Sequence, residues 1–294
     1  RTVIMGCGRQ GPVRIPVAQL YLSLQQSFFA SPKCHVTSPR RHRATMLSSL
    51  SSTEWIFLIL GALGIGVSKS GFPGLSMFHV VLYAFVFGAR ESTGVLLPML
   101  VVGDCFAIYV FGRKAVWAQV RRLLPPTLLG IFIGWLLMGQ LDETIFKRLV
   151  GSIILSLTLV QVVRIWKPRW FDKVPHTHWF AFTLGLLAGL TTMLANAAGP
   201  VVALYLLAVS LPKWELIGTT AWLFLVLNVL KLPLSYNLGL ITPSTLIVGA
   251  AMSVAIPVGI FSGRWMVSRV SQRWFNGILL AFTGIAAMRL IGVF

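Results

Sequence analysis

The chain has 294 residues, of which 56% are hydrophobic and only 11% are charged. Soluble domains carry roughly 25% charged residues, so this composition excludes an ordinary soluble domain. Several apolar stretches approach the ~20 residues that cross a bilayer as a helix. Alternating segments of about 10 residues, typical of membrane barrels, do not occur. The composition therefore predicts an all-α integral membrane protein.

The formal net charge of +18 does not indicate nucleic-acid binding. Lys and Arg form short clusters between apolar segments, which is the positive-inside pattern of membrane proteins. Basic and aromatic residues do not interleave along a polar face, as a nucleic-acid surface would require. The three cysteines lack the spacing of a disulfide framework or a zinc site. The sequence gives no reason to expect a cofactor and does not indicate the oligomeric state.

Residues 1–45 differ from the rest because they contain basic residues but no acidic one. Two interpretations compete. The segment is either a basic targeting sequence or upstream sequence translated in error, with the protein starting at Met46. We favour the second interpretation. In either case the segment is treated as non-native or disordered and is excluded from the fold.

Ten apolar segments follow. The first half has 55–67, 73–88, 92–111, 123–140 and 149–165, and the second half has 178–193, 197–211, 216–236, 244–262 and 274–292. The first two segments of each half are short, and a helix-breaking run separates them. These runs are 68–74 and 191–200, rich in Gly, Pro and small polar residues.

The two halves resemble each other at an offset of roughly 125 residues, typical of a duplicated transporter half. Gly74 matches Gly199, Gly134 falls opposite Gly259, and Asp104 falls opposite Asn228. We therefore expect a first membrane repeat over 46–166, a cytoplasmic linker over 167–177 and a second repeat over 178–294.

Loop charges predict the orientation of these repeats. The loops 112–122, 164–177 and 263–273 are basic, whereas 141–148 is balanced and 237–243 is uncharged. Five segments per half place the basic loops on one side of the membrane and the other two on the opposite side. An odd number of segments also makes the second repeat inverted relative to the first, with the substrate site near the midplane.

The first break contains the most informative residue, Lys69, flanked by Ser68, Ser70 and Gly71. Freed backbone N–H groups and the start of a half-helix attract negative charge. An ammonium group at membrane depth costs about 3 kcal/mol, so it needs a partner, water or a bound anion. We expect this run to bind an anion. The alternative is that Lys69 lies shallow and extends to the interface.

Asp104 is the only acidic residue inside a long apolar segment. It carries a proton for coupling, or it neutralises a nearby cation such as Lys69 or Lys231, and the sequence does not separate these roles. Lys231 lies late in its segment, and extension to the interface is its expected fate. Asn228, opposite Asp104 in the repeat, is expected to hydrogen-bond across the bundle.

The second break carries Asn196, Gly199 and Pro200. Pro removes a backbone donor and frees a carbonyl, which is tolerated at depth only inside protein or beside a watery cavity. Thr219 and Thr220, at the start of the next segment, either donate hydroxyls to an oxyanion or pack closely against a neighbouring helix. We expect Asn196, Gly199 and both threonines to complete the site. No metal site is expected.

Several runs resemble a branch of the sulfite exporter TauE/SafE family of membrane permeases. They are Gly64-Ile-Gly-Val-Ser-Lys-Ser-Gly-Phe-Pro-Gly74, Leu97-Pro-Met-Leu-Val-Val-Gly-Asp104, Gly218-Thr-Thr220 and Asn228-Val-Leu-Lys-Leu-Pro233. The similarity extends from residue 55 to the C-terminus. The chain departs from the family pattern at Ser70, Pro73 and Asn196, and these differences bear on the substrate more than on the fold.

The resemblance implies a permease of small sulfur-containing or organic anions such as sulfite or sulfonates. We expect a multi-pass secondary transporter in the lipid bilayer of the bacterial inner (cell) membrane, with the proton as a possible coupling ion. A passive anion channel is the first alternative. A membrane-embedded enzyme or assembly factor is the second, although the sequence carries no enzyme signature.

Overall fold

The computed structural model describes residues 2–5, 13–16, 50–167, 178–269 and 272–293. The chain forms two compact units, Arg1–Thr45 and Met46–Phe294. In the first unit, β1 (Thr2–Met5) pairs with β2 (Val13–Pro16) in an antiparallel ladder. The remainder of 1–45 and residues 168–177 of the expected linker lie outside the described residues. The assignment of these two segments stays a prediction.

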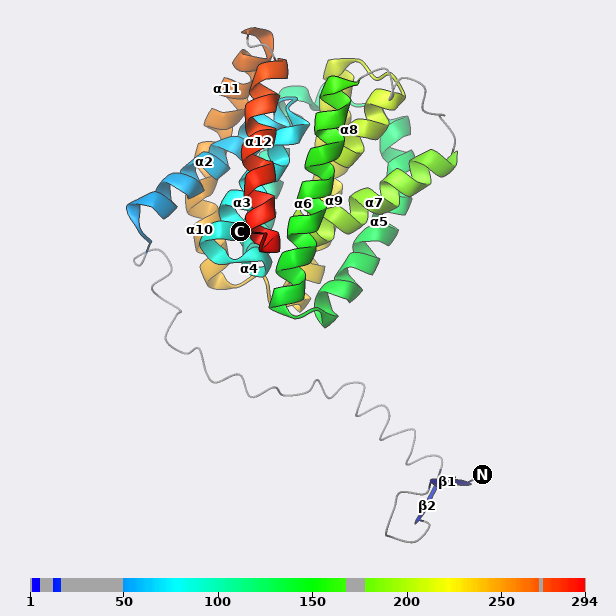
Figure 1. Cartoon of the computed structure of the whole chain (residues 1–294). Coiled ribbons are helices and arrows are strands. Elements are labelled where there is room, and N and C mark those ends of the chain that lie inside the picture. Colours follow the sequence, from blue (N-terminus) through cyan, green and yellow to red (C-terminus); the bar gives the residue numbers. More distant parts are fainter. Residues whose placement is uncertain (1, 6–12, 17–49, 168–177, 270–271, 294) are drawn as a thin grey trace. The chain divides into compact units, whose positions relative to one another are not determined.

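The second unit is helical throughout its described part, which confirms the all-α membrane class (Figure 1). Two short 3-10 turns, η1 and η2, join α-helices in the first half. In chain order the elements are α2 (Ser52–Lys69), η1 (Pro73–Leu75), α3 (Ser76–Phe87), α4 (Ala89–Phe111), η2 (Gly112–Lys114), α5 (Trp117–Gln140), α6 (Glu143–Trp166), α7 (His178–Ala195), α8 (Gly199–Ala208), α9 (Lys213–Asn237), α10 (Pro243–Ser253), α11 (Ala255–Arg269) and α12 (Gln272–Ile291).

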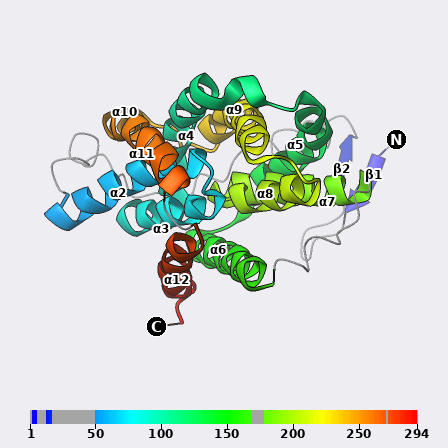
Figure 2. The ribbon, with the colours of Figure 1, turned by 90° about the horizontal axis from the view of Figure 1, so that it is seen from above.

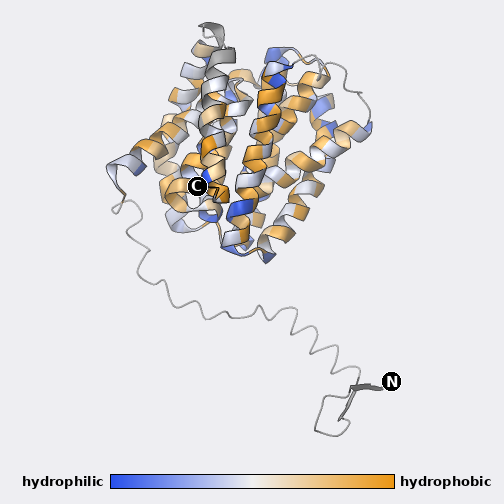
Figure 3. Cartoon of the chain, viewed as in Figure 1, coloured by the Kyte–Doolittle hydropathy of each residue, from blue (hydrophilic) through white to orange (hydrophobic). Residues whose placement is uncertain are grey.

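Within the described residues, six helical stretches are long and apolar enough to cross a membrane. They are α2, α4 continued into η2, α5, α6, α7 and α9. The helices α3 and α8 are shorter and apolar, as the two breaks predict. Apolar residues run along most of each helix, and hydrophilic residues gather mainly near the ends (Figure 3). The chain is therefore an integral, multi-pass membrane protein.

One predicted segment differs from the structure. The run 244–262 is expected to be one helix, but it forms α10 and α11, which meet at an angle of 41° and form either one broken span or a re-entrant pair. Pro257 explains the bend, because a proline inside a helix clashes with the carbonyl four residues earlier, here that of Ser253. The interruption falls at Val254, between these two residues.

Helices of the first half pack against helices of the second half. The helix α2 packs along α11, α7 packs along α5, and α4 packs along α9. Seen from above, α2, α10 and α11 lie at one side, α5 and α7 at the other, and α6 with α12 forms a separate edge (Figure 2). In the repeat, α2 of the first half corresponds to α7 of the second, and α5 corresponds to α10 and α11. The α2–α11 contact therefore has its counterpart in the α7–α5 contact. A duplicated fold gives this correspondence, and the inverted relation of the repeats stays a prediction.

Buried tyrosines fix the two short helices in the core. Tyr83 of α3 is fully buried, and its hydroxyl donates to the carbonyl oxygen of Leu58 in α2 at 3.2 Å. Tyr205 of α8 donates in the same way to Oε1 of Gln119 in α5 at 2.8 Å. Because a buried hydroxyl needs a partner, these bonds set the depth at which α3 and α8 sit.

Glycines allow the closest helix contacts. A Cβ atom on Gly189 of α7 would lie 2.0 Å from the carbonyl oxygen of Thr127, and one on Gly130 of α5 would lie 2.1 Å from that of Leu186. At the α2–α11 contact, a Cβ on Gly66 or Gly259 would lie 2.3 Å from a backbone oxygen. Small residues thus let these backbones touch, as is common in membrane bundles.

We predict that Gly130→Ala and Gly189→Ala each destabilise the protein by about 1–3 kcal/mol, because the added methyl group forces the two backbones apart. Thermal unfolding in detergent measures the loss. Gly277→Ala in α12 is the matched control, since no atom lies within 4 Å of a Cβ built there. An unchanged melting temperature in Gly189→Ala would contradict the close contact.

Candidate functional site

Each break ends one helix and starts another within a few residues. After α2 the chain passes through Gly71, whose φ of +117° suits glycine, before η1 and α3 begin. After α7 it passes through Asn196 with φ of +50°, a conformation that Asn tolerates better than most residues. Pro200 then occupies the first turn of α8, where its missing N–H costs nothing.

The helices α2 and α7 approach from opposite sides and end in the middle of the unit (Figure 1). A cavity lies between their ends, and it holds about 680 Å³ of empty space, including the part open to solvent. Both breaks and one side of α9 line it. Its lining residues include Ser68, Lys69, Gly71, Ser76 and His79 from the first break region, Thr192, Asn196, Ala198 and Gly199 from the second, and Ile217, Thr220, Phe224 and Asn228 from α9.

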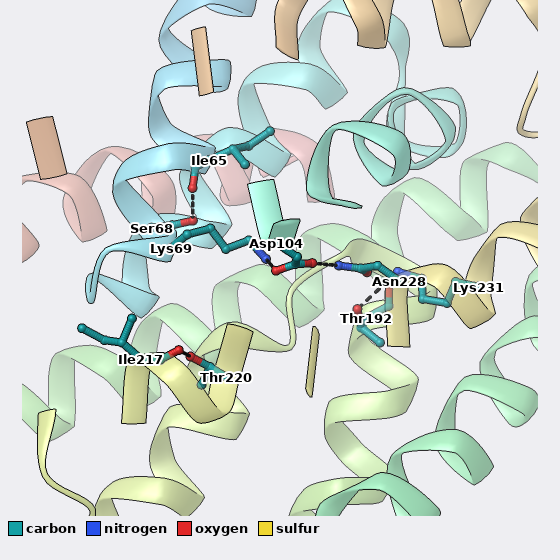
Figure 4. A network of polar contacts seen from close by, with 9 residues as sticks. All are labelled: Ile65, Ser68, Lys69, Asp104, Thr192, Ile217, Thr220, Asn228 and Lys231. Atoms are coloured by element: carbon teal, nitrogen blue, oxygen red, sulfur yellow. Dashed lines mark hydrogen bonds and ion pairs between the residues drawn. The ribbon is translucent and has the colours of Figure 1, made fainter. Parts of the chain in front are cut away.

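A chain of polar contacts crosses the cavity wall (Figure 4). Nζ of Lys69 lies 2.5 Å from Oδ1 of Asp104, and Nδ2 of Asn228 donates to Oδ2 of the same carboxylate at 2.7 Å. The Asp104 side chain is fully buried, and that of Lys69 is 9% exposed. Lys69 also lies 4.9 Å from the centre of the Phe224 ring. The interpretation of Lys69 as a shallow, interfacial residue is therefore wrong.

The contact settles which cation Asp104 pairs with. The sequence offered Lys69 and Lys231, and the ion pair is with Lys69. The two positions that match between the halves, Asp104 and Asn228, touch each other as expected for a hydrogen bond across the bundle. Proton transfer by Asp104 stays a prediction.

Lys231 does not extend to the interface, so that interpretation is corrected. It is 1% exposed, and its ammonium group donates to Oδ1 of Asn196 at 2.5 Å and to the carbonyl oxygen of Thr192 at 2.8 Å. The reason is that Lys231 lies beside the C-terminal end of α7. There the carbonyl oxygen of Thr192 accepts from the ammonium group as well as from the backbone N–H of Asn196. A cation at this end of a helix also complements the helix dipole. Lys231 thus connects α9 to the second break through these hydrogen bonds.

The structure brings part of the expected site together. Ser68, Gly71, Gly199 and Thr220 line the cavity with Lys69, Asn196 and Asn228. The hydroxyls of Ser68 and Thr220 donate to carbonyls of their own helices, at 2.7 and 2.9 Å. Either hydroxyl would therefore have to rotate before it could donate to a ligand.

Ser70 and Thr219 lie outside the cavity lining. Ser70 is fully buried and donates to the carbonyl oxygen of Ile260 in α11 at 2.8 Å. The hydroxyl oxygen of Thr219 accepts from the backbone N–H of Val116 at 2.9 Å. The packing alternative therefore describes Thr219, and both side chains join neighbouring helices.

The cavity lining includes residues that sequence reasoning missed, among them Ser76, His79, Thr192 and Phe224. A signal existed for His79, since it is the only histidine in the interior of an apolar segment. Thr192 stands in the second break run but resembles an ordinary helix residue there. Nothing in the sequence distinguishes Phe224 from the other apolar residues of its segment.

The electrostatics of this region favour an anion. Lys69 and Asn196 line the cavity; Lys69 pairs with the carboxylate of Asp104, and Asn196 accepts from the ammonium group of Lys231. Among these residues, two ammonium groups stand against one carboxylate. The helices α3 and α8 begin at the cavity, and neither has a side-chain cap at its N-terminus. Helix N-termini carry partial positive charge, so the cavity can hold an oxyanion between a cation and backbone donors.

The buried ion pair leads to a stability prediction. Lys69→Met or Asp104→Leu alone leaves one buried charge unpaired and is expected to cost about 3–5 kcal/mol. The double variant removes both charges and should recover most of that loss. Thermal unfolding of the four proteins in one detergent forms the cycle. Additive losses in the double variant would show that the two side chains do not interact.

Comparison with known proteins agrees with this geometry. No curated protein and no solved structure matches the chain. Residues 56–290, which include both breaks and every residue of the polar contact chain, match the sulfite exporter TauE/SafE family. The match covers most of the chain, so the protein belongs to the sulfite exporter TauE/SafE family.

Proposed function

We propose that this protein is a secondary transporter of small sulfur-containing or organic anions such as sulfite or sulfonates. The family is one of membrane transporters of sulfite-like anions. The observation that carries the proposal is a single cavity between two helix breaks, with the buried ammonium group of Lys69 in its wall. Broken helices meeting at mid-depth are the usual substrate sites of such transporters.

In this proposal, Lys69 and the N-terminal amides of α8 bind the anion. In the structure, the ammonium group of Lys69 pairs with the carboxylate of Asp104. An arriving anion competes with that carboxylate for the same ammonium group. Protonation of Asp104 removes the competition, because a neutral carboxyl group no longer holds the cation as strongly. One proton on Asp104 thus accompanies one anion on Lys69, and the charge of the site is conserved.

The burial of Asp104 supports a transporter over a passive channel. A passive pathway needs no buried acid, whereas the structure keeps Asp104 fully buried between Lys69 and Asn228. Buried ionisable groups in membrane spans commonly mark substrate or proton pathways. The basic loops on one side support an orientation with those loops in the cytoplasm, and we place the protein in a bacterial inner membrane.

The test is uptake of labelled sulfite and methanesulfonate into proteoliposomes containing the full chain, with and without a pH gradient. We expect accumulation against the anion gradient when the pH gradient is present. Lys69→Gln should reduce uptake about 10-fold or more, because a charge-assisted contact of about 1.5–3 kcal/mol is lost. Asp104→Asn should abolish the effect of the pH gradient.

Two exposed residues of α6 provide matched controls. Lys147→Gln and Glu143→Gln remove the same kinds of charge at residues that are exposed and do not line the cavity, and they should leave uptake unchanged. Flux that ignores the pH gradient and never exceeds equilibrium would instead identify a passive channel. Equal uptake by Lys69→Gln and wild type at equal expression would remove Lys69 from the site.

A further inference from the structure

We infer that His79 is a further binding residue of the cavity, whose ring N–H donates a hydrogen bond to an oxygen of the bound anion. The inference rests on the proposed function and extends it to the substrate class. That class is an oxyanion with at least two acceptor oxygens, one for Lys69 and one for His79. Sulfite and sulfonates both meet this requirement.

The position of His79 supports this role. It lies one turn after Ser76, the first residue of α3, so it belongs to the half-helix that begins at the first break. It lines the same cavity as Lys69 and Asn196. Only 1% of its surface is exposed. Because the side chain is shielded from bulk solvent and lines the cavity, a ligand bound there is the partner that we propose for it.

His79 is also unsatisfied. Neither Nδ1 nor Nε2 has a hydrogen-bond partner among the described protein atoms. A neutral imidazole carries one N–H donor and one acceptor nitrogen. Buried polar groups in native proteins almost always have partners, and leaving one unpaired costs free energy. An anion that accepts from the ring N–H would remove part of that cost.

Other polar side chains around the cavity are already engaged. The Ser68 and Thr220 hydroxyls donate to helix carbonyls, and the Asn228 amide donates to Asp104. The Asn196 amide donates to the carbonyl oxygen of Thr93 at 3.3 Å. His79 therefore offers a donor that needs no existing bond to break, and this distinguishes it from these four residues.

The test measures binding of sulfite and of methanesulfonate to the purified full chain in detergent by titration calorimetry. His79→Leu keeps an apolar side chain of similar size but removes the donor, and we expect the dissociation constant to rise about 10-fold or more for both anions. His79→Asn places an amide N–H near the position of Nδ1, and His79→Gln places one near Nε2. At least one of these should keep the affinity within about 3-fold of wild type.

Two other buried nitrogens without partners serve as matched controls, Nε1 of Trp135 and Nε2 of Gln161. Neither residue lines the cavity, so Trp135→Phe and Gln161→Met should leave both dissociation constants unchanged. The melting temperature of every variant is measured alongside, so that a loss of folded protein is not mistaken for a loss of binding.

Three results would overturn the inference. If wild type binds and His79→Leu binds equally well, His79 does not contact the anion. If Leu, Asn and Gln all lose binding together with a lowered melting temperature, His79 has a packing role. If wild type binds neither anion and transports neither, the proposed function fails and the inference falls with it.

Discussion

The constraint on which this structure depends is the burial of two ammonium groups inside a membrane protein. Moving such a charge out of water costs several kcal/mol, about 3 kcal/mol or more at the centre of a spanning helix. Lys69 is compensated by Asp104 and, through it, by Asn228. Lys231 is compensated by Asn196 and by the carbonyl oxygen of Thr192 near the end of α7. The helices α2, α4, α7 and α9 each contribute a residue to one or both of these arrangements.

The helix α9 connects the two arrangements. Asn228 and Lys231 are three residues apart and therefore lie on one face of it. One reaches the carboxylate that pairs with Lys69 at the end of α2, and the other reaches the end of α7 (Figure 4). The helix α9 therefore contributes to the polar contacts of both breaks. Separately, the glycine contacts hold α2 close to α11 and α7 close to α5.

Part of the site followed from sequence because the residues concerned have few alternatives at membrane depth. A lysine in a helix break and a lone aspartate in an apolar run both demand partners, so Lys69 and Asp104 stood out. Asn228 was found because it falls opposite Asp104 at the repeat offset. Ser70, Thr219 and Lys231 were misplaced because the sequence shows a side chain's chemistry and not the element that it faces. His79 was missed although it stood in an apolar run.

The sequence by itself determined the membrane class, most of the spans and the two breaks, because hydropathy, proline and glycine act over a few neighbouring residues. Only the tertiary structure decided which group each polar side chain meets. Ser70 bonds to a carbonyl 190 residues away, and Val116 donates to Thr219 across 103 residues. Such contacts depend on how helices from both halves pack, and local sequence carries no record of that packing.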